Sequence, residues 1–222
     1  MLNFKAFPLG VASTTLLTLS FGSVAQSLTL ESAALGTTNN LGGYGVATSQ
    51  YLGWRFDLTE ALQVTAIGGH LGQLFPEKLF GAIVQLDNST ALPSDSPADL
   101  PTSQKLKAYT TFGALLSSAD LTTPLSVLLN PGSYALIFGS GQFGATGRGY
   151  MPFNNRDRPN ASYFFSIDDQ YVNGGIRNTR FVVQGNPVTA AVPTPALLPG
   201  LIGLGVAALR RRKAEKVVVP RK

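Results

Sequence analysis

The chain has 222 residues, of which 13% are charged, and a formal net charge of +5. The basic excess belongs to the two ends: the stretch from Gln26 to Ala196 holds 9 basic and 11 acidic residues, a net charge of −2, which argues against nucleic-acid binding. The absence of cysteine excludes disulfides, thiolate catalysis and Cys-ligated metal sites.

The first 25 residues have the three parts of a secretory signal peptide. Lys5 supplies a positive charge, residues 6–19 are mainly apolar, and Ser23-Val24-Ala25 places small residues before Gln26. We therefore predict cleavage between Ala25 and Gln26. The alternative is a buried helix or an anchor that is not cleaved.

The stretch 26–186 is predicted to be one all-β domain, an antiparallel β-sandwich or jelly-roll-like fold. Apolar residues alternate over short runs, as in Leu52, Trp54, Phe56 and Leu58, whereas no segment keeps a helical period for three turns. Asn130-Pro131-Gly132 favours a turn, which predicts a hairpin there. The expected strands cover residues 51–58, 62–67, 79–86, 125–129, 134–138, 162–167 and 179–184.

Two segments of this body are expected to be irregular. Residues 87–105 carry three prolines among Ser and Asp residues, so we expect a solvated, mobile loop. Residues 139–159 are rich in Gly and Asn, and Gly139 to Gly144 fit the pattern G-x-G-x-x-G. Because the residues after Gly144 are poor helix formers, we interpret the match as a glycine-rich loop and not as a dinucleotide site.

The C-terminal end has a second address-like design. Residues 187–196 form a linker that ends in Pro193-Thr194-Pro195-Ala196, and 197–213 combine a short apolar span with the basic cluster Arg210, Arg211, Arg212 and Lys213. The 13 residues from Leu197 to Leu209 would span roughly 20 Å as a helix, short of the ~30 Å hydrocarbon core. The basic cluster is expected to remain cytoplasmic, with 214–222 as a cytoplasmic tail.

This tail resembles the PEP-CTERM sorting signal, in the Pro-Thr-Pro-Ala variant of cyanobacterial-type proteins. The resemblance implies recognition of Pro193, Thr194 and Pro195 by a membrane-embedded exosortase, processing near Ala196, and delivery to the cell surface or extracellular matrix. The implied partners are exosortase and the secretion machinery, with the membrane at least transiently. Thr194 stands where the name-giving Glu would be, and 9 residues follow the basic cluster. The alternative is an ordinary tail anchor that is never processed.

The body is also similar to a domain found in other exported PEP-CTERM proteins. The similarity rests on runs such as Gly53-Trp54-Arg55-Phe56, residues 131–147 and Asn178-Thr179-Arg180-Phe181-Val182-Val183. Such domains have no settled activity, so the likeness implies fold and address and not chemistry.

One polar and aromatic cluster suggests a second function, binding of extracellular polysaccharide. Sugar-binding sandwiches set flat aromatic rings against pyranose faces and surround them with amide, carboxylate and guanidinium groups. The alternative is that the tyrosines pack in the core and the asparagines hold turns. The candidate ligand-binding residues are Tyr150, Asn154, Asn155, Asp157, Tyr171, Asn173 and Arg177.

Catalytic and metal chemistry find weaker support. His70 is the single histidine, with no G-x-S-x-G elbow in the chain, and we interpret it as a surface or hydrogen-bonded loop residue. Paired carboxylates such as Asp157 with Asp168 or Asp169 would suit a glycosidase, and Asp168 and Asp169 with Asn173 would suit Ca²⁺. We predict a non-catalytic structural or interaction protein without a cofactor, and keep sugar binding and a carboxylate hydrolase as alternatives.

Overall fold

The computed structural model describes residues 27–75, 77–113 and 116–188. The predicted signal peptide with its Ala25–Gln26 cleavage site, the Pro193–Ala196 motif and the Arg210–Lys213 cluster lie outside the described residues. Within the described ranges, no helix is long and apolar enough to cross a lipid bilayer.

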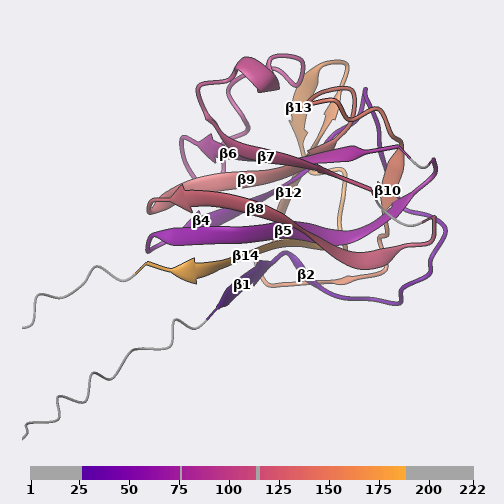
Figure 1. Ribbon diagram of the computed structural model, residues 1–222, viewed down its shortest axis with the longest axis horizontal. Helices are drawn as coiled ribbons and strands as arrows, with labels where there is room; N and C mark the ends of the chain where they lie inside the picture. The colour runs from indigo at the N-terminus through magenta and orange to yellow at the C-terminus, as the bar shows by residue number, and fades with distance from the viewer. Residues whose placement is uncertain (1–26, 76, 114–115, 189–222) are drawn as a thin grey trace, which may run out of the picture.

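Two six-stranded antiparallel sheets make up the body (Figure 1). The prediction of an all-β antiparallel fold is confirmed, and the described residues contain no α-helix. The first sheet contains β1 (Leu28–Glu31), β14 (Phe181–Pro187), β5 (Leu62–Gln73), β8 (Ala119–Leu129), β10 (Gly149–Met151) and β3 (Tyr44–Val46). The second contains β13 (Gln170–Asn173), β12 (Ser162–Ile167), β4 (Leu52–Leu58), β9 (Gly132–Gly139), β6 (Leu79–Leu86) and β7 (Leu106–Phe112). A short ladder joins β2 (Ala33–Ala34) to β11 (Arg156–Asp157).

The turn at Asn130–Gly132 is not the hairpin that the sequence predicted. It carries the chain from β8, which pairs with β5, to β9, which pairs with β4 and β6 in the other sheet. The Tyr134 hydroxyl donates to the Asn130 carbonyl oxygen at 2.8 Å across this turn. A Pro-Gly pair reverses the chain, but the choice of pairing partner depends on which faces each strand must bury.

The main core lies between the two sheets. The predicted inward row of β4, namely Leu52, Trp54, Phe56 and Leu58, is buried there, which confirms the alternation. The Trp54 ring stacks on Phe56 with centroids 5.3 Å apart. Burial of such aromatic and aliphatic side chains supplies the main stabilisation of the body.

A second apolar cluster covers the outer face of the second sheet. Strands β6 and β9 are buried on both faces, because the side chains on their outer face, among them Phe80, Ala82 and Ile137, are also covered. Residues 87–105, the covering segment, provide this cover. Pro93, Pro97 and Leu100 are buried, and the short 3₁₀-helix η1 (Leu100–Thr102) lies in this segment. Residues 87–90 are exposed, as the expectation of a solvated loop required, but the expectation fails for the apolar residues of the segment, because these pack on the sheet.

Ion pairs connect strand β1 to the rest of the body. Glu31 pairs with both Arg158 and Arg180, and Arg180 also contacts Asp120 at 2.9 Å. Burial alone would raise the pKa of Glu31, but the two guanidinium groups outweigh it and the pKa is lowered.

Candidate functional site

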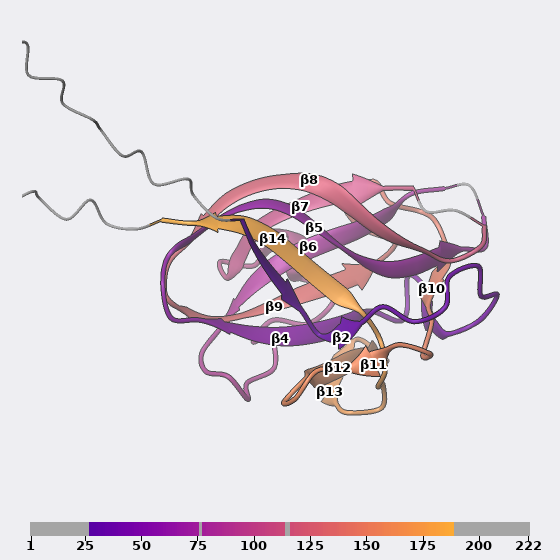
Figure 2. The same cartoon turned by 90° about the horizontal axis from the view of Figure 1, so that it is seen from below.

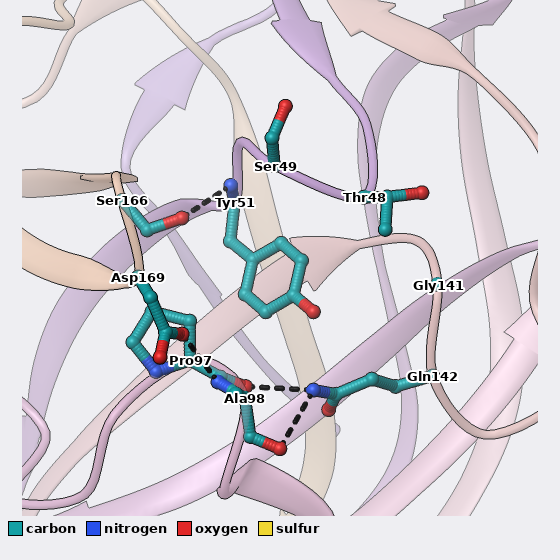
Figure 3. A pocket seen from close by; sticks show the side chains of 9 residues that line it. All are labelled: Thr48, Ser49, Tyr51, Pro97, Ala98, Gly141, Gln142, Ser166 and Asp169. Atoms are coloured by element: carbon teal, nitrogen blue, oxygen red, sulfur yellow. Dashed lines mark hydrogen bonds between the residues drawn. The ribbon is translucent and has the colours of Figure 1, made fainter.

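A hollow of about 300 Å³ opens where four loops meet at one end of the second sheet (Figure 3). The loop before β4 supplies Thr48, Ser49 and Tyr51, the covering segment supplies Pro97 and Ala98, the loop after β9 supplies Gly141 and Gln142, and the β12–β13 hairpin supplies Ser166 and Asp169. Its size is at the lower end of small-ligand sites, which measure about 300–1,000 Å³.

The walls of the hollow are held in place by hydrogen bonds between those loops. Gln142 donates from Nε2 to the carbonyl oxygens of Pro97 and Ala98, at 2.8 and 3.0 Å. Asp169 accepts from the Ala98 backbone N–H at 2.8 Å, and Ser166 accepts from the Tyr51 N–H at 2.8 Å. The covering segment is therefore attached on two sides, to the loop after β9 and to the β12–β13 hairpin.

The G-x-G-x-x-G stretch forms one wall of this hollow, and at two of its positions the structure requires glycine. Gly141 has a φ of +82°, which an L side chain adopts only with strain. A Cβ at Gly139 would lie 2.5 Å from ring atoms of both Tyr51 and Phe80. The stretch is a loop, as expected, and the next regular element is strand β10 and not a helix.

The predicted ligand-binding cluster does not form one surface. Tyr150 is buried, and its hydroxyl donates to the carbonyl oxygens of Asn40 and Leu116, at 2.7 and 3.0 Å. Asn155 is buried as well, whereas Asn154 is exposed and donates to the Thr37 carbonyl at 2.9 Å. The expectation that Tyr150 and Asn155 face a ligand was wrong, because both satisfy backbone groups in the interior.

The remaining members of that cluster serve different parts of the fold. Asp157 accepts a 2.6 Å hydrogen bond from the Tyr163 hydroxyl, and Asn173 accepts one from Arg55. Tyr171 packs edge-on against Phe164, and burial raises the pKa of its hydroxyl. Arg177 is exposed on the segment between β13 and β14.

His70 lies in strand β5 and is fully buried, not in a surface loop. Asn155 donates from Nδ2 to the Pro152 and Asn178 carbonyls, so its Oδ1 faces His70 Nδ1 at 2.9 Å and accepts from it. His70 Nε2 then accepts from the Ser118 hydroxyl at 2.9 Å. Both ring nitrogens therefore make hydrogen bonds inside the fold, which confirms the expectation of a hydrogen-bonded histidine.

Arg55 is a buried cation on the outer face of β4. Its guanidinium donates to the Ala91 carbonyl at 2.7 Å, to the Ser162 hydroxyl at 3.0 Å and to Asn173, and it lies 5.0 Å from the centroid of the Phe164 ring. Burial lowers its pKa. Arg55 thus joins the covering segment to the β12–β13 hairpin, at the end of that hairpin away from its Asp168–Asp169 turn.

The carboxylates considered for Ca²⁺ or hydrolysis occupy a turn. Asp168 and Asp169 have φ of +49° and +59° and form the two-residue connection of the β12–β13 hairpin. Asn173 faces Arg55, so it is not available to a cation beside them. Over residues 27–75, 77–113 and 116–188, no three acidic or histidine side chains are placed to hold a metal ion.

Sequence reasoning singled out Asp169, but for other chemistry, and it did not find the hollow, because the lining residues come from four separate loops. A second signal was the glycine-rich run after a strand, since Gln142 lies inside it. No protein-family model matches the sequence, and no curated protein shows significant similarity to it.

Proposed function

We propose that the chain is an exported protein of the cell surface or extracellular matrix, sorted by its PEP-CTERM-like tail and acting there as a non-catalytic structural or interaction protein. In this proposal the body is a jelly-roll-like β-sandwich. Exosortase and the secretion machinery are its processing partners, and residues 197–213 hold it in the membrane transiently.

The observation that carries the proposal is the placement of the two ends of the described body. Leu28 pairs with Gly185 at the β1–β14 ladder, and the Val188 N–H donates to the Ala61 carbonyl at 2.8 Å, so both ends lie together (Figure 2). Strand β4 begins directly after Tyr51 of the hollow and ends at Leu58, three residues before Ala61. Its seven residues separate the hollow from the terminal end by about 20 Å. A body held by its tail would present the hollow away from the membrane.

The internal use of reactive side chains supports an interaction role over catalysis. His70 and Arg55 are buried among hydrogen-bond partners, and Asp157 is held by the Tyr163 hydroxyl. These contacts give each of the three residues a structural role inside the body.

Intact-mass measurement of material released from the cell surface tests the sorting proposal. We expect a polypeptide that begins near Gln26 and ends near Pro195. The double variant Pro193→Ala, Pro195→Ala should retain the tail, whereas Pro199→Ala, a proline three residues past the motif, should be processed normally. A wild-type protein that still ends at Lys222 would indicate a permanent anchor, and a full-length cytosolic chain with its leader would contradict export.

A second candidate function is binding of extracellular polysaccharide. The hollow favours it, since hydroxyl, amide and carboxylate groups surround the Tyr51 ring there. Retention on immobilised exopolysaccharide tests this function. The control is the same column matrix without polysaccharide, loaded with the same sample. Equal retention on the two columns would contradict polysaccharide binding.

A further inference from the structure

The hollow has a polar group that the protein itself leaves unused: Gln142, one of its lining residues, has a buried Oε1 without a hydrogen-bond partner. The Tyr171 hydroxyl is not part of the lining, but it is also buried without a partner, and it lies close enough to the Asp169 carboxylate for that charge to add to the effect of burial in raising its pKa. A buried polar atom without a partner costs about 1–3 kcal/mol. A ligand that supplied hydrogen bonds in this region would recover part of that cost.

The charges around the hollow select against an anion. None of the nine lining residues is basic, and the Asp169 carboxylate is among them. A neighbouring hollow of about 250 Å³ shares Ser49 and Ser166 with the first and adds Asp168. Burial and the nearby Asp169 raise the pKa of the Tyr51 hydroxyl to about 12, so this group keeps its proton at neutral pH. An uncharged ligand rich in hydroxyl groups fits this lining.

A row of aromatic rings leads from the hollow to the surface. The Tyr51 and Phe80 centroids are 5.2 Å apart, those of Phe80 and Phe143 are 5.1 Å apart, and Phe143 stacks on Tyr109 at 4.1 Å. Tyr109 on β7 is 50% exposed. Phe143 has a φ of +53°, a conformation that is strained for a side chain of this size and sets its ring against Tyr109. Phe143 directly follows Gln142 of the hollow in the chain, and its stack with Tyr109 offers a flat apolar platform of the kind that packs against a sugar ring.

We propose that the hollow binds one uncharged sugar unit of an extracellular polysaccharide and that the next unit lies against Tyr109. This inference rests on the proposed interaction role at the end of the body remote from the chain termini. It differs from the cluster that the sequence suggested, because Tyr150 and Asn155 are interior and the hollow uses Tyr51, Gln142 and Asp169.

Calorimetric titration of the full chain in detergent, with cellohexaose and maltohexaose against an oligogalacturonate of equal length, tests the proposal. We expect one of the neutral oligomers to bind and the anionic oligomer to bind at least about tenfold more weakly. Tyr51→Phe removes a single hydroxyl and should weaken neutral-sugar binding about fivefold to tenfold. Tyr109→Ala removes the platform and should weaken it about tenfold or more.

Tyr44→Phe is the matched control. Its ring packs on Phe153, outside the hollow, so the dissociation constant of the variant should stay within about twofold of wild type. Unchanged thermal unfolding of Tyr51→Phe would show that any loss is one of binding. Preference for the anionic oligomer, absence of binding to both neutral oligomers, or equal effects of Tyr51→Phe and Tyr44→Phe would overturn the inference. The intact-mass result on sorting is independent of all three.

Discussion

Replacement of Asn155 by alanine distinguishes an interior role from a ligand-binding role more sharply than any other substitution. The Asn155 amide uses its full capacity: Oδ1 accepts from His70 Nδ1 at 2.9 Å and from the Gly36 N–H at 3.0 Å, and Nδ2 donates to the carbonyls of Pro152 and Asn178, at 2.8 and 2.9 Å. Asn155→Ala leaves the His70 donor fully buried without an acceptor.

The expected loss follows from these contacts. A buried donor without an acceptor costs about 1–3 kcal/mol. Two donors and the Pro152 carbonyl lose their partner here, whereas the Asn178 carbonyl keeps the backbone N–H of residue 155 at 3.2 Å. Water entering the gap restores some of these bonds, so we expect Asn155→Ala to lower the free energy of unfolding by about 3 kcal/mol. That is a large share of the roughly 5–15 kcal/mol by which a domain is stable.

Urea unfolding followed by tryptophan fluorescence measures this difference, since Trp54 lies in the core. Asn154→Ala is the matched control: the neighbouring residue is exposed and makes a single bond to Thr37, so it should change stability by less than about 1 kcal/mol. A loss below about 0.5 kcal/mol for Asn155→Ala, or equal losses for both variants, would refute the reasoning.

Three further substitutions test other parts of the fold. Because the pKa of Glu31 is lowered in the folded state, this carboxylate stabilises the fold above its ordinary pKa of 4.5, and the effect is lost as the pH falls below that value. Glu31→Gln should therefore cost about 1–2 kcal/mol at pH 7 and less at pH 3 in urea unfolding, and equal costs at both pH values would contradict this. Gly139→Ala should lower stability by about 1–3 kcal/mol in thermal unfolding, because its Cβ would meet Tyr51 and Phe80; an unchanged midpoint would show that the rings have room to move. Leu100→Ala should cost about 2–4 kcal/mol by urea unfolding, since the side chain is 2% exposed, whereas a loosely attached loop would show almost no change.

The amino-acid sequence by itself determined the class of fold and several strand positions. Alternation of apolar residues placed Leu52, Trp54, Phe56 and Leu58 on one buried face, and strands 79–86 and 162–167 agree with β6 and β12 residue for residue. Such patterns can be read locally, because side chains two residues apart in a strand share a face. The address-like ends were equally visible in the sequence, and their function stays a prediction.

Only the tertiary structure decided which residues meet. The turn at Asn130–Gly132 proved to cross between sheets, the 87–105 segment proved to be a cover, and Tyr150 and Asn155 proved to be interior. The hollow joins Tyr51, Gln142 and Asp169 from loops far apart in the chain. Strand pairing and the burial of outer faces depend on long-range contacts, so no local pattern fixes them, and it is these contacts that bring the candidate site together.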